Sequence, residues 1–170
     1  MTEPSNSWYM RTVFALILIV LSCSNCSNDN GDGIDCALFD PAFPTLFLKL
    51  VDANNTNLFE NGTLNPDDIK VMGNLPNTGF VFNPADQFAV PDADIRMLDN
   101  TIQLFIPNAS NFQYTIYLSA NDSVVVDFSA ELTKIPCDLS YYLPLEGTFD
   151  TSKLELQEVS SLQFLGVLEP

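Results

Sequence analysis

The chain has 170 residues, no histidine, and 22 acidic against six basic residues, which gives a formal net charge of −16 at pH 7. Without histidine it lacks the usual general base of Ser-His and Cys-His nucleophile pairs and the commonest transition-metal ligand. Because so acidic a surface repels phosphate groups, we expect no nucleic-acid partner.

An apolar run near the N-terminus predicts a signal peptide. Residues 12–21 read TVFALILIVL and follow Arg11. A helix that crosses a bilayer needs about 20 apolar residues. A shorter apolar run after a positive residue is typical of a secretory signal. Residues 1–9 contain Glu3 and no basic residue, so Met10 is an alternative start of translation that would leave residues 1–9 untranslated.

The residues after the apolar run resemble those of a protein family. Val20-Leu21-Ser22-Cys23 resembles a bacterial lipobox, whose cysteine is lipidated and becomes the first mature residue. The SNCSNDNGDGID that follows is similar to the acidic leaders of Bacteroidota lipoproteins sent to the cell surface. Residues 43–71 are similar to uncharacterised small lipoproteins of that group, a likeness that carries no activity with it.

This resemblance implies membrane lipid as a partner through acylated Cys23. It implies an outer-membrane location, facing outward, with the periplasmic face as the alternative. Two or more acyl chains give stable attachment, since each buried methylene adds about 0.8 kcal/mol. An ordinary secretory signal with a chance cysteine is the other interpretation.

We expect three segments along the chain. Residues 1–22 form the signal peptide, residues 23–40 hold the lipidated cysteine and a flexible acidic spacer, and residues 41–170 form one folded domain. A domain of that length buries roughly two thirds of the surface that its unfolded chain exposes.

The spacer imitates the first half of an EF-hand calcium loop. Its oxygen ligands would be Asn28, Asn30, Asp32 and Asp35. Phe39 stands where the loop requires a bidentate glutamate, so we favour a solvated spacer. A second weak calcium candidate, an acidic loop, comprises Asp86, Asp92, Asp94 and Asp99. We expect no cofactor, with calcium the one candidate.

The folded domain has the pattern of an all-β protein. Alternation places Leu46, Leu48 and Leu50 on one face of a strand over residues 45–52. The further expected strands, separated by turns, span residues 68–73, 79–82, 101–107, 112–119, 123–132, 153–159 and 162–168. The strands from 101 to 132 indicate an antiparallel meander, and only residues 91–98 indicate a helical turn. We expect an antiparallel β-sandwich, immunoglobulin-like or related, with a small open barrel as the alternative.

Three acids are candidates for histidine-free glycoside hydrolysis, which needs two carboxylates at the right separation. They are Asp127, Glu131 and Glu146. Asp127 and Glu131 lie in an alternating strand, where acids form the solvent-facing row, so we expect no enzyme.

Several polar motifs are candidate modification sites. Four Asn-x-Ser/Thr sequons, besides one in the leader, would carry glycans in a eukaryotic secretory pathway. If the chain has a bacterial lipobox, they instead reflect the composition of turns. Their asparagines are Asn54, Asn61, Asn108 and Asn121. Asp122-Ser123-Val124 resembles the O-glycosylation site of Bacteroidota, with Ser123 as acceptor.

Lipidation of Cys23 leaves three cysteines, an odd number in an oxidising envelope. Cys26 lies in the spacer. We favour a disulfide between Cys36 and Cys137, which closes a loop of about 100 residues and stabilises by up to about 4.7 kcal/mol. Two buried, reduced thiols are the alternative.

We expect a non-catalytic binding or accessory module of an outer-membrane protein complex. Tyr141 and Tyr142 are the interface candidates, because tyrosine is favoured at interfaces. The alternative is a carbohydrate-binding surface module, which the position of the only tryptophan, Trp8, in the leader weakens. A histidine-free hydrolase comes third.

Overall fold

The computed structural model describes residues 33–88, 90 and 93–170. It divides the chain into two units, Met1–Phe39 and Asp40–Pro170. In the first unit, Asp35 supports a turn, since its carbonyl oxygen accepts from the Leu38 N–H at 3.0 Å and its Oδ1 from the Ala37 N–H at 2.9 Å. Several residues named in the sequence analysis as candidate sites lie outside the described residues. They are Cys23, Cys26, Asn28, Asn30, Asp32 and Asp92.

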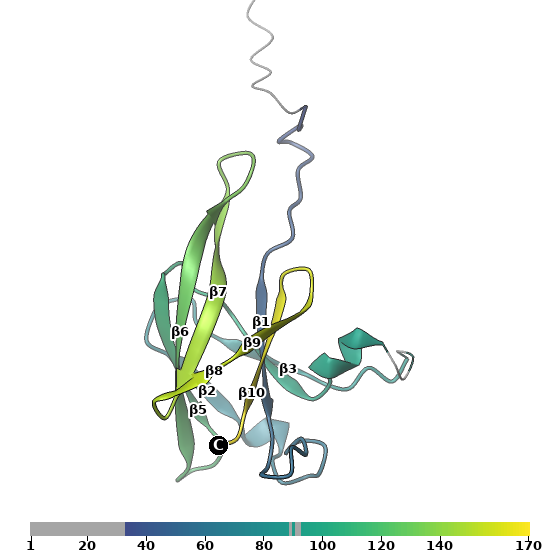
Figure 1. The fold of residues 1–170 in the computed structure, drawn as a ribbon, viewed down its shortest axis with the longest axis vertical. Coiled ribbons are helices and arrows are strands. Elements are labelled where there is room, and N and C mark those ends of the chain that lie inside the picture. Colours follow the sequence, from purple (N-terminus) through teal and green to yellow (C-terminus); the bar gives the residue numbers. More distant parts are fainter. Residues whose placement is uncertain (1–32, 89, 91–92) are drawn as a thin grey trace, which may run out of the picture. The chain divides into compact units, whose positions relative to one another are not determined.

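The second unit consists of two five-stranded sheets (Figure 1). The first sheet holds, in spatial order, β3 (Phe80–Asn83), β4 (Thr101–Leu104), β1 (Thr45–Leu50), β10 (Gln163–Leu168) and β9 (Leu156–Ser160). The second sheet holds β2 (Lys70–Gly73), β5 (Asn111–Tyr117), β6 (Ser123–Lys134), β7 (Ser140–Phe149) and β8 (Ser152–Leu154). This arrangement confirms the predicted β-sandwich, and the sheets do not close into the alternative barrel.

Helical structure is confined to two short 3₁₀ helices, η1 (Pro66–Asp68) and η2 (Asp94–Leu98), within the described residues. The second confirms the helical turn predicted over residues 91–98. Among the residues that the structure describes, no helix is long and apolar enough to cross a membrane.

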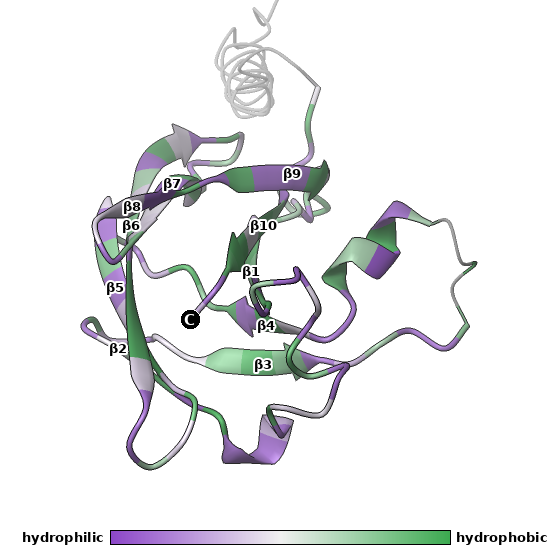
Figure 2. Ribbon diagram, turned by 60° about the horizontal axis from the view of Figure 1, so that its bottom comes forward, coloured by the Kyte–Doolittle hydropathy of each residue, from purple (hydrophilic) through white to green (hydrophobic). Residues whose placement is uncertain are grey.

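The main core lies between the two sheets. Leu46, Leu48 and Leu50 of β1 are fully buried, as their alternation predicts. Ile116 of β5 and Val126 of β6 are also fully buried in this cluster. The mixture of hydrophilic and hydrophobic colours along single strands in Figure 2 follows the same alternation. Each fully buried aliphatic side chain contributes about 1.5–3 kcal/mol.

A smaller core forms on the other face of the first sheet. Phe47 points away from the main core and clusters with Leu98 of η2 and Leu165 of β10. The Leu98 carbonyl oxygen accepts from Asn83 Nδ2 at 2.5 Å and from Thr101 Oγ1 at 2.6 Å. Helix η2 therefore covers part of this sheet, which explains how β1 can be apolar on both faces.

The strand connections differ from the expected meander in two respects. Strands β5 to β8 do form an antiparallel meander, but β4 lies in the other sheet, between β3 and β1. In addition, β1 pairs with β10 in parallel, with Leu46 opposite Phe164. The two ends of the domain are thus neighbours in one sheet, a pairing that no local pattern signals.

Two strand assignments also need correction. Strand β7 was not expected, because Pro144 and Gly147 interrupt its pattern. Residues 153–159 were expected as one strand and form two, β8 and β9, which belong to different sheets. The chain passes between the sheets at Glu155, so its alternation continues although its pairing partners change.

Two of the hairpin turns each place two consecutive non-glycine residues at positive φ. Asp150 (φ +47°) and Thr151 (φ +67°) join the paired residues Phe149 and Ser152. Cys137 (φ +66°) and Asp138 (φ +56°) lie in the turn between β6 and β7. Cys36 and Cys137 are disulfide-bonded, which confirms the predicted bridge.

Candidate binding surfaces

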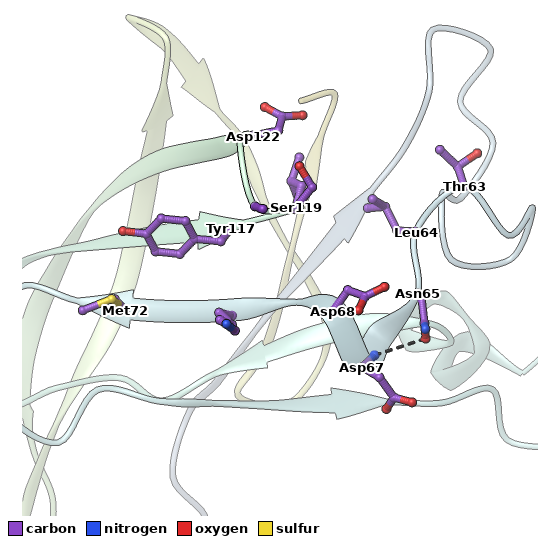
Figure 3. Close-up of a pocket in the computed structure, with 12 residues that line it drawn as sticks. Thr63, Leu64, Asn65, Asp67, Asp68, Met72, Tyr117, Ser119 and Asp122 are labelled. Atoms are coloured by element: carbon purple, nitrogen blue, oxygen red, sulfur yellow. Dashed lines mark hydrogen bonds between the residues drawn. The ribbon is translucent and has the colours of Figure 1, made fainter.

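A groove of about 930 Å³ lies beside the edge strand β2 of the second sheet (Figure 3). We call it the Tyr117 groove. Its volume is within the roughly 300–1,000 Å³ of ligand-binding clefts. It is lined by Thr63, Leu64, Asn65, Asp67, Asp68, Lys70, Met72, Tyr117, Leu118, Ser119, Ala120 and Asp122.

Strand alternation places the apolar side chains of this groove. Tyr114 and Ile116 of β5 are buried in the core, so Tyr117 falls on the outer face. It is in register with Lys70 of β2. Met72, two residues further along β2, is 61% exposed, an apolar side chain left in water at the groove.

Two turns fix the polar walls of the groove. Asn65 caps η1, where its Oδ1 accepts from the Asp67 N–H at 3.2 Å. The Asp122 carbonyl oxygen accepts from the N–H groups of Leu118 at 2.9 Å and Ser119 at 3.2 Å. Within the described residues, the carboxylates of Asp67, Asp68 and Asp122 make no hydrogen bond or ion pair. Their oxygens are therefore available to a ligand.

The catalytic candidates are only partly brought together. Asp127 and Glu146 line one hollow of about 330 Å³, and Glu131 does not. Asp127 Oδ1 accepts from Gln113 Nε2 at 2.8 Å, and Glu146 Oε2 lies 3.9 Å from Lys153 Nζ. Both carboxylates face solvent on the outer surface of the sheet. Catalytic acids, in contrast, are usually at least partly buried in a site that adjusts their pKa values.

The acidic loop expected as a calcium candidate is held by an arginine. Arg96 Nη2 lies 3.2 Å from Asp99 Oδ2, and Arg96 Nη1 donates to the Asp86 carbonyl oxygen at 3.2 Å. Asp99 Oδ1 also accepts from the Asp86 N–H at 3.1 Å. In the part of the chain that the structure describes, which includes Asp94, no group of three or more acids, cysteines or histidines could hold a metal ion.

The two candidate interface tyrosines have different environments. Tyr142 packs against the main core. Tyr141 meets Phe43 edge to face, with ring centroids 6.2 Å apart at an interplanar angle of 78°. Phe43 is 52% exposed. We call the hollow here, of about 190 Å³, the Tyr141 shelf; it is lined by Phe43, Pro44, Ile106, Pro107, Asn108, Ser140, Tyr141 and Tyr142.

The β7 residues of the shelf, Ser140 to Tyr142, belong to a projecting ribbon. Strand β6 pairs with β5 only as far as Ser129, but it pairs with β7 as far as Lys134. Strand β8 pairs with β7 only from Gly147 onward. Residues 130–134 and 140–144 therefore continue beyond both neighbouring strands, as Figure 1 shows for the β6–β7 hairpin.

The candidate modification residues all lie at the surface. Ser123 is exposed at the start of β6 and pairs with Tyr117. The four sequon asparagines are exposed as well, namely Asn54, Asn61, Asn108 and Asn121. Tyr117 and Phe43 were not predicted as surface aromatics, although the alternation expected over residues 112–119 already places Tyr117 opposite the buried face.

Comparison with protein-family models, with curated proteins and with solved structures gives no match.

Proposed function

We propose that this chain is a non-catalytic binding module, held at the outer membrane by a lipid on Cys23 and facing outward. The observation that carries the proposal is the Tyr141 shelf, where the Phe43 and Tyr141 rings meet beside a projecting ribbon. Large, stiff aromatic side chains at a hollow are the usual anchors of protein interfaces. Tyr142, packed against the core, also lines the shelf.

The environments of the candidate catalytic acids support a binding function more than a catalytic one. Asp127 and Glu146 lie in an open hollow, and each already interacts with a neighbouring side chain, Gln113 or Lys153. A hydrolytic pair needs one carboxyl group kept protonated by a low-dielectric environment. That environment is not built around either group.

The charge of the chain indicates the kind of protein partner. With 22 acidic and six basic residues, the chain favours a partner whose contact surface is rimmed by lysine or arginine. Complementary charge speeds the encounter, and the aromatic rings of the shelf supply the affinity after desolvation. The anchor at Cys23 would keep the domain close to membrane-protein partners.

Co-purification of the full, tagged chain from detergent-solubilised outer membranes tests this proposal. We expect one stoichiometric membrane-protein partner. Phe43→Ala and Tyr141→Ala should each reduce its recovery about tenfold, because interface anchors contribute more than about 1 kcal/mol each. Tyr117→Ala is the matched control on another surface and should leave recovery unchanged. Absence of a partner, or equal recovery with all three variants, would contradict the proposal.

A carbohydrate-binding module is the second candidate function. The observation that favours it is the Tyr117 groove, which combines an aromatic ring with unpaired polar groups. The two functions use different surfaces, so one chain can perform both.

A further inference from the structure

We propose that the Tyr117 groove binds a neutral, hydroxyl-rich sugar residue of a surface glycan. This goes beyond capture of a protein partner at the Tyr141 shelf and uses none of the shelf's residues. The inference deepens the second candidate function by naming the site and the chemical class of its ligand.

The apolar part of the groove suits a sugar ring. Tyr117 is half-buried, so its ring is held in place while one side remains accessible. Figure 3 shows Tyr117 between Met72 on one side and Asp122 and Ser119 on the other. A pyranose offers a face of C–H groups that packs against an aromatic ring and a thioether, which is how an apolar platform binds a polar molecule.

The charges of the groove disfavour an anionic ligand and keep a cation away from the Tyr117 ring. An anionic ligand would meet three carboxylates, those of Asp67, Asp68 and Asp122. A cation placed over the Tyr117 ring would meet Lys70, the residue paired with Tyr117 on β2. Because adjacent strands are only about 4.8 Å apart, the Lys70 ammonium group would repel such a cation at short range. A neutral ligand meets neither penalty.

The polar groups match hydroxyls, each of which both donates and accepts hydrogen bonds. The three carboxylates are acceptors with no partner among the described residues. Lys70 and the Tyr117 hydroxyl are donors, and Asn65 retains its Nδ2 donor because only its Oδ1 caps η1. A mixed set of donors and acceptors of this kind suits vicinal hydroxyls.

Glycan-array binding followed by calorimetry tests the inference. The probe set is neutral oligosaccharides of hexoses and pentoses, with sulfated and uronic-acid glycans and Lys/Arg peptides as comparison arms. The full mature chain in detergent should bind neutral glycans, and Tyr117→Ala should weaken binding at least tenfold. Tyr117→Phe, which keeps the ring, should stay within about threefold of wild type. Asp122→Asn should also weaken binding, since it exchanges an acceptor for a donor.

Tyr141→Ala is the matched control and should leave glycan affinity unchanged. Absence of neutral-glycan binding, or preference for an anionic glycan or a basic peptide, would overturn the inference. Glycan binding that survives both Tyr117→Ala and Asp122→Asn would place the site elsewhere and overturn it too. Glycan binding and recovery of a protein partner are measured separately and depend on different surfaces. Failure of glycan binding at the Tyr117 groove can therefore be distinguished from failure of partner binding at the Tyr141 shelf.

Discussion

The phenolic hydroxyl of Tyr114 donates a hydrogen bond to the backbone carbonyl oxygen of Phe105. The bond links β5 of one sheet to the residue that follows β4 of the other. Tyr114 is fully buried, and this burial raises the pKa of its hydroxyl to about 12, with a hydrogen bond to the Gly79 backbone opposing part of the shift. A polar link between the sheets is thus enclosed in the core.

The raised pKa of Tyr114 predicts a loss of stability in alkali. Below pH 10 the tyrosine is protonated in both the folded and the unfolded chain, so its contribution is fully present. Between pH 10 and about 12 only the unfolded chain releases the proton, and the free energy of unfolding falls by about 1.4 kcal/mol per pH unit. Rapid urea unfolding measured from pH 9 to 12 should show this slope.

Tyr114→Phe removes both the titration and the hydrogen bond. We expect it to cost about 1–3 kcal/mol at pH 7, because the Phe105 carbonyl oxygen loses its partner. The alkaline slope should be smaller in this variant. An alkaline slope in Tyr114→Phe identical to that of the wild type would show that Tyr114 is not its source.

The turn between β7 and β8 is a site where glycine should stabilise the fold. Thr151 is β-branched and has φ +67°, a conformation that costs an L-residue about 1–2 kcal/mol and glycine almost nothing. After the entropy that glycine loses on folding, Thr151→Gly should stabilise by up to about 1 kcal/mol, measured by urea denaturation. The same exchange at Thr148, within β7, should destabilise; stabilisation at both positions would refute the conformational explanation.

Gly166 of β10 is expected to tolerate no side chain. A Cβ there would lie 3.0 Å from Leu48 Cδ2 and 3.2 Å from Cδ2 of both Leu154 and Leu156. Gly166→Ala should therefore cost about 1–3 kcal/mol through overpacking of the core. Val167→Ala, at an exposed position of the same strand, should change the unfolding midpoint little. A neutral Gly166→Ala would mean that the three leucines repack without strain.

The disulfide predicts a stability that depends on redox conditions. Replacing Cys36 and Cys137 by serine should cost about 2–4 kcal/mol, since the bridge constrains a long loop of the unfolded chain. Chemical denaturation with and without reductant measures the effect, and non-reducing peptide mapping identifies the pair. Cys26→Ser is the control and should have no effect. Free, alkylatable thiols at Cys36 and Cys137 in protein from oxidised envelopes would contradict the prediction.

The sequence predicts those strands in which apolar residues occupy every second position without interruption. The burial of Leu46, Leu48 and Leu50 follows directly from their alternation. Strand β7 escapes prediction because Pro144 and Gly147 break its pattern. Pro144 is compatible with the sheet because this part of β7 extends beyond β8, so the edge requires no N–H from it.

Pairing between distant segments is not encoded in any local pattern. The parallel contact of β1 with β10 and the change of sheet at Glu155 depend on packing of the whole domain. The same holds for the binding surfaces. Alternation places Tyr117 on an outer face, but only the register of β2 brings Lys70 beside it, and only the fold brings Phe43 to Tyr141.

The proposed lipid anchor at Cys23 determines where the binding surfaces are presented. Mass spectrometry of the N-terminal peptide of the mature protein, purified from membranes, tests it most directly. We predict a peptide that begins at Cys23 and carries both a diacylglyceryl thioether and an amide-linked acyl chain. A mature chain that begins at another residue, or whose Cys23 is unmodified, would contradict the account.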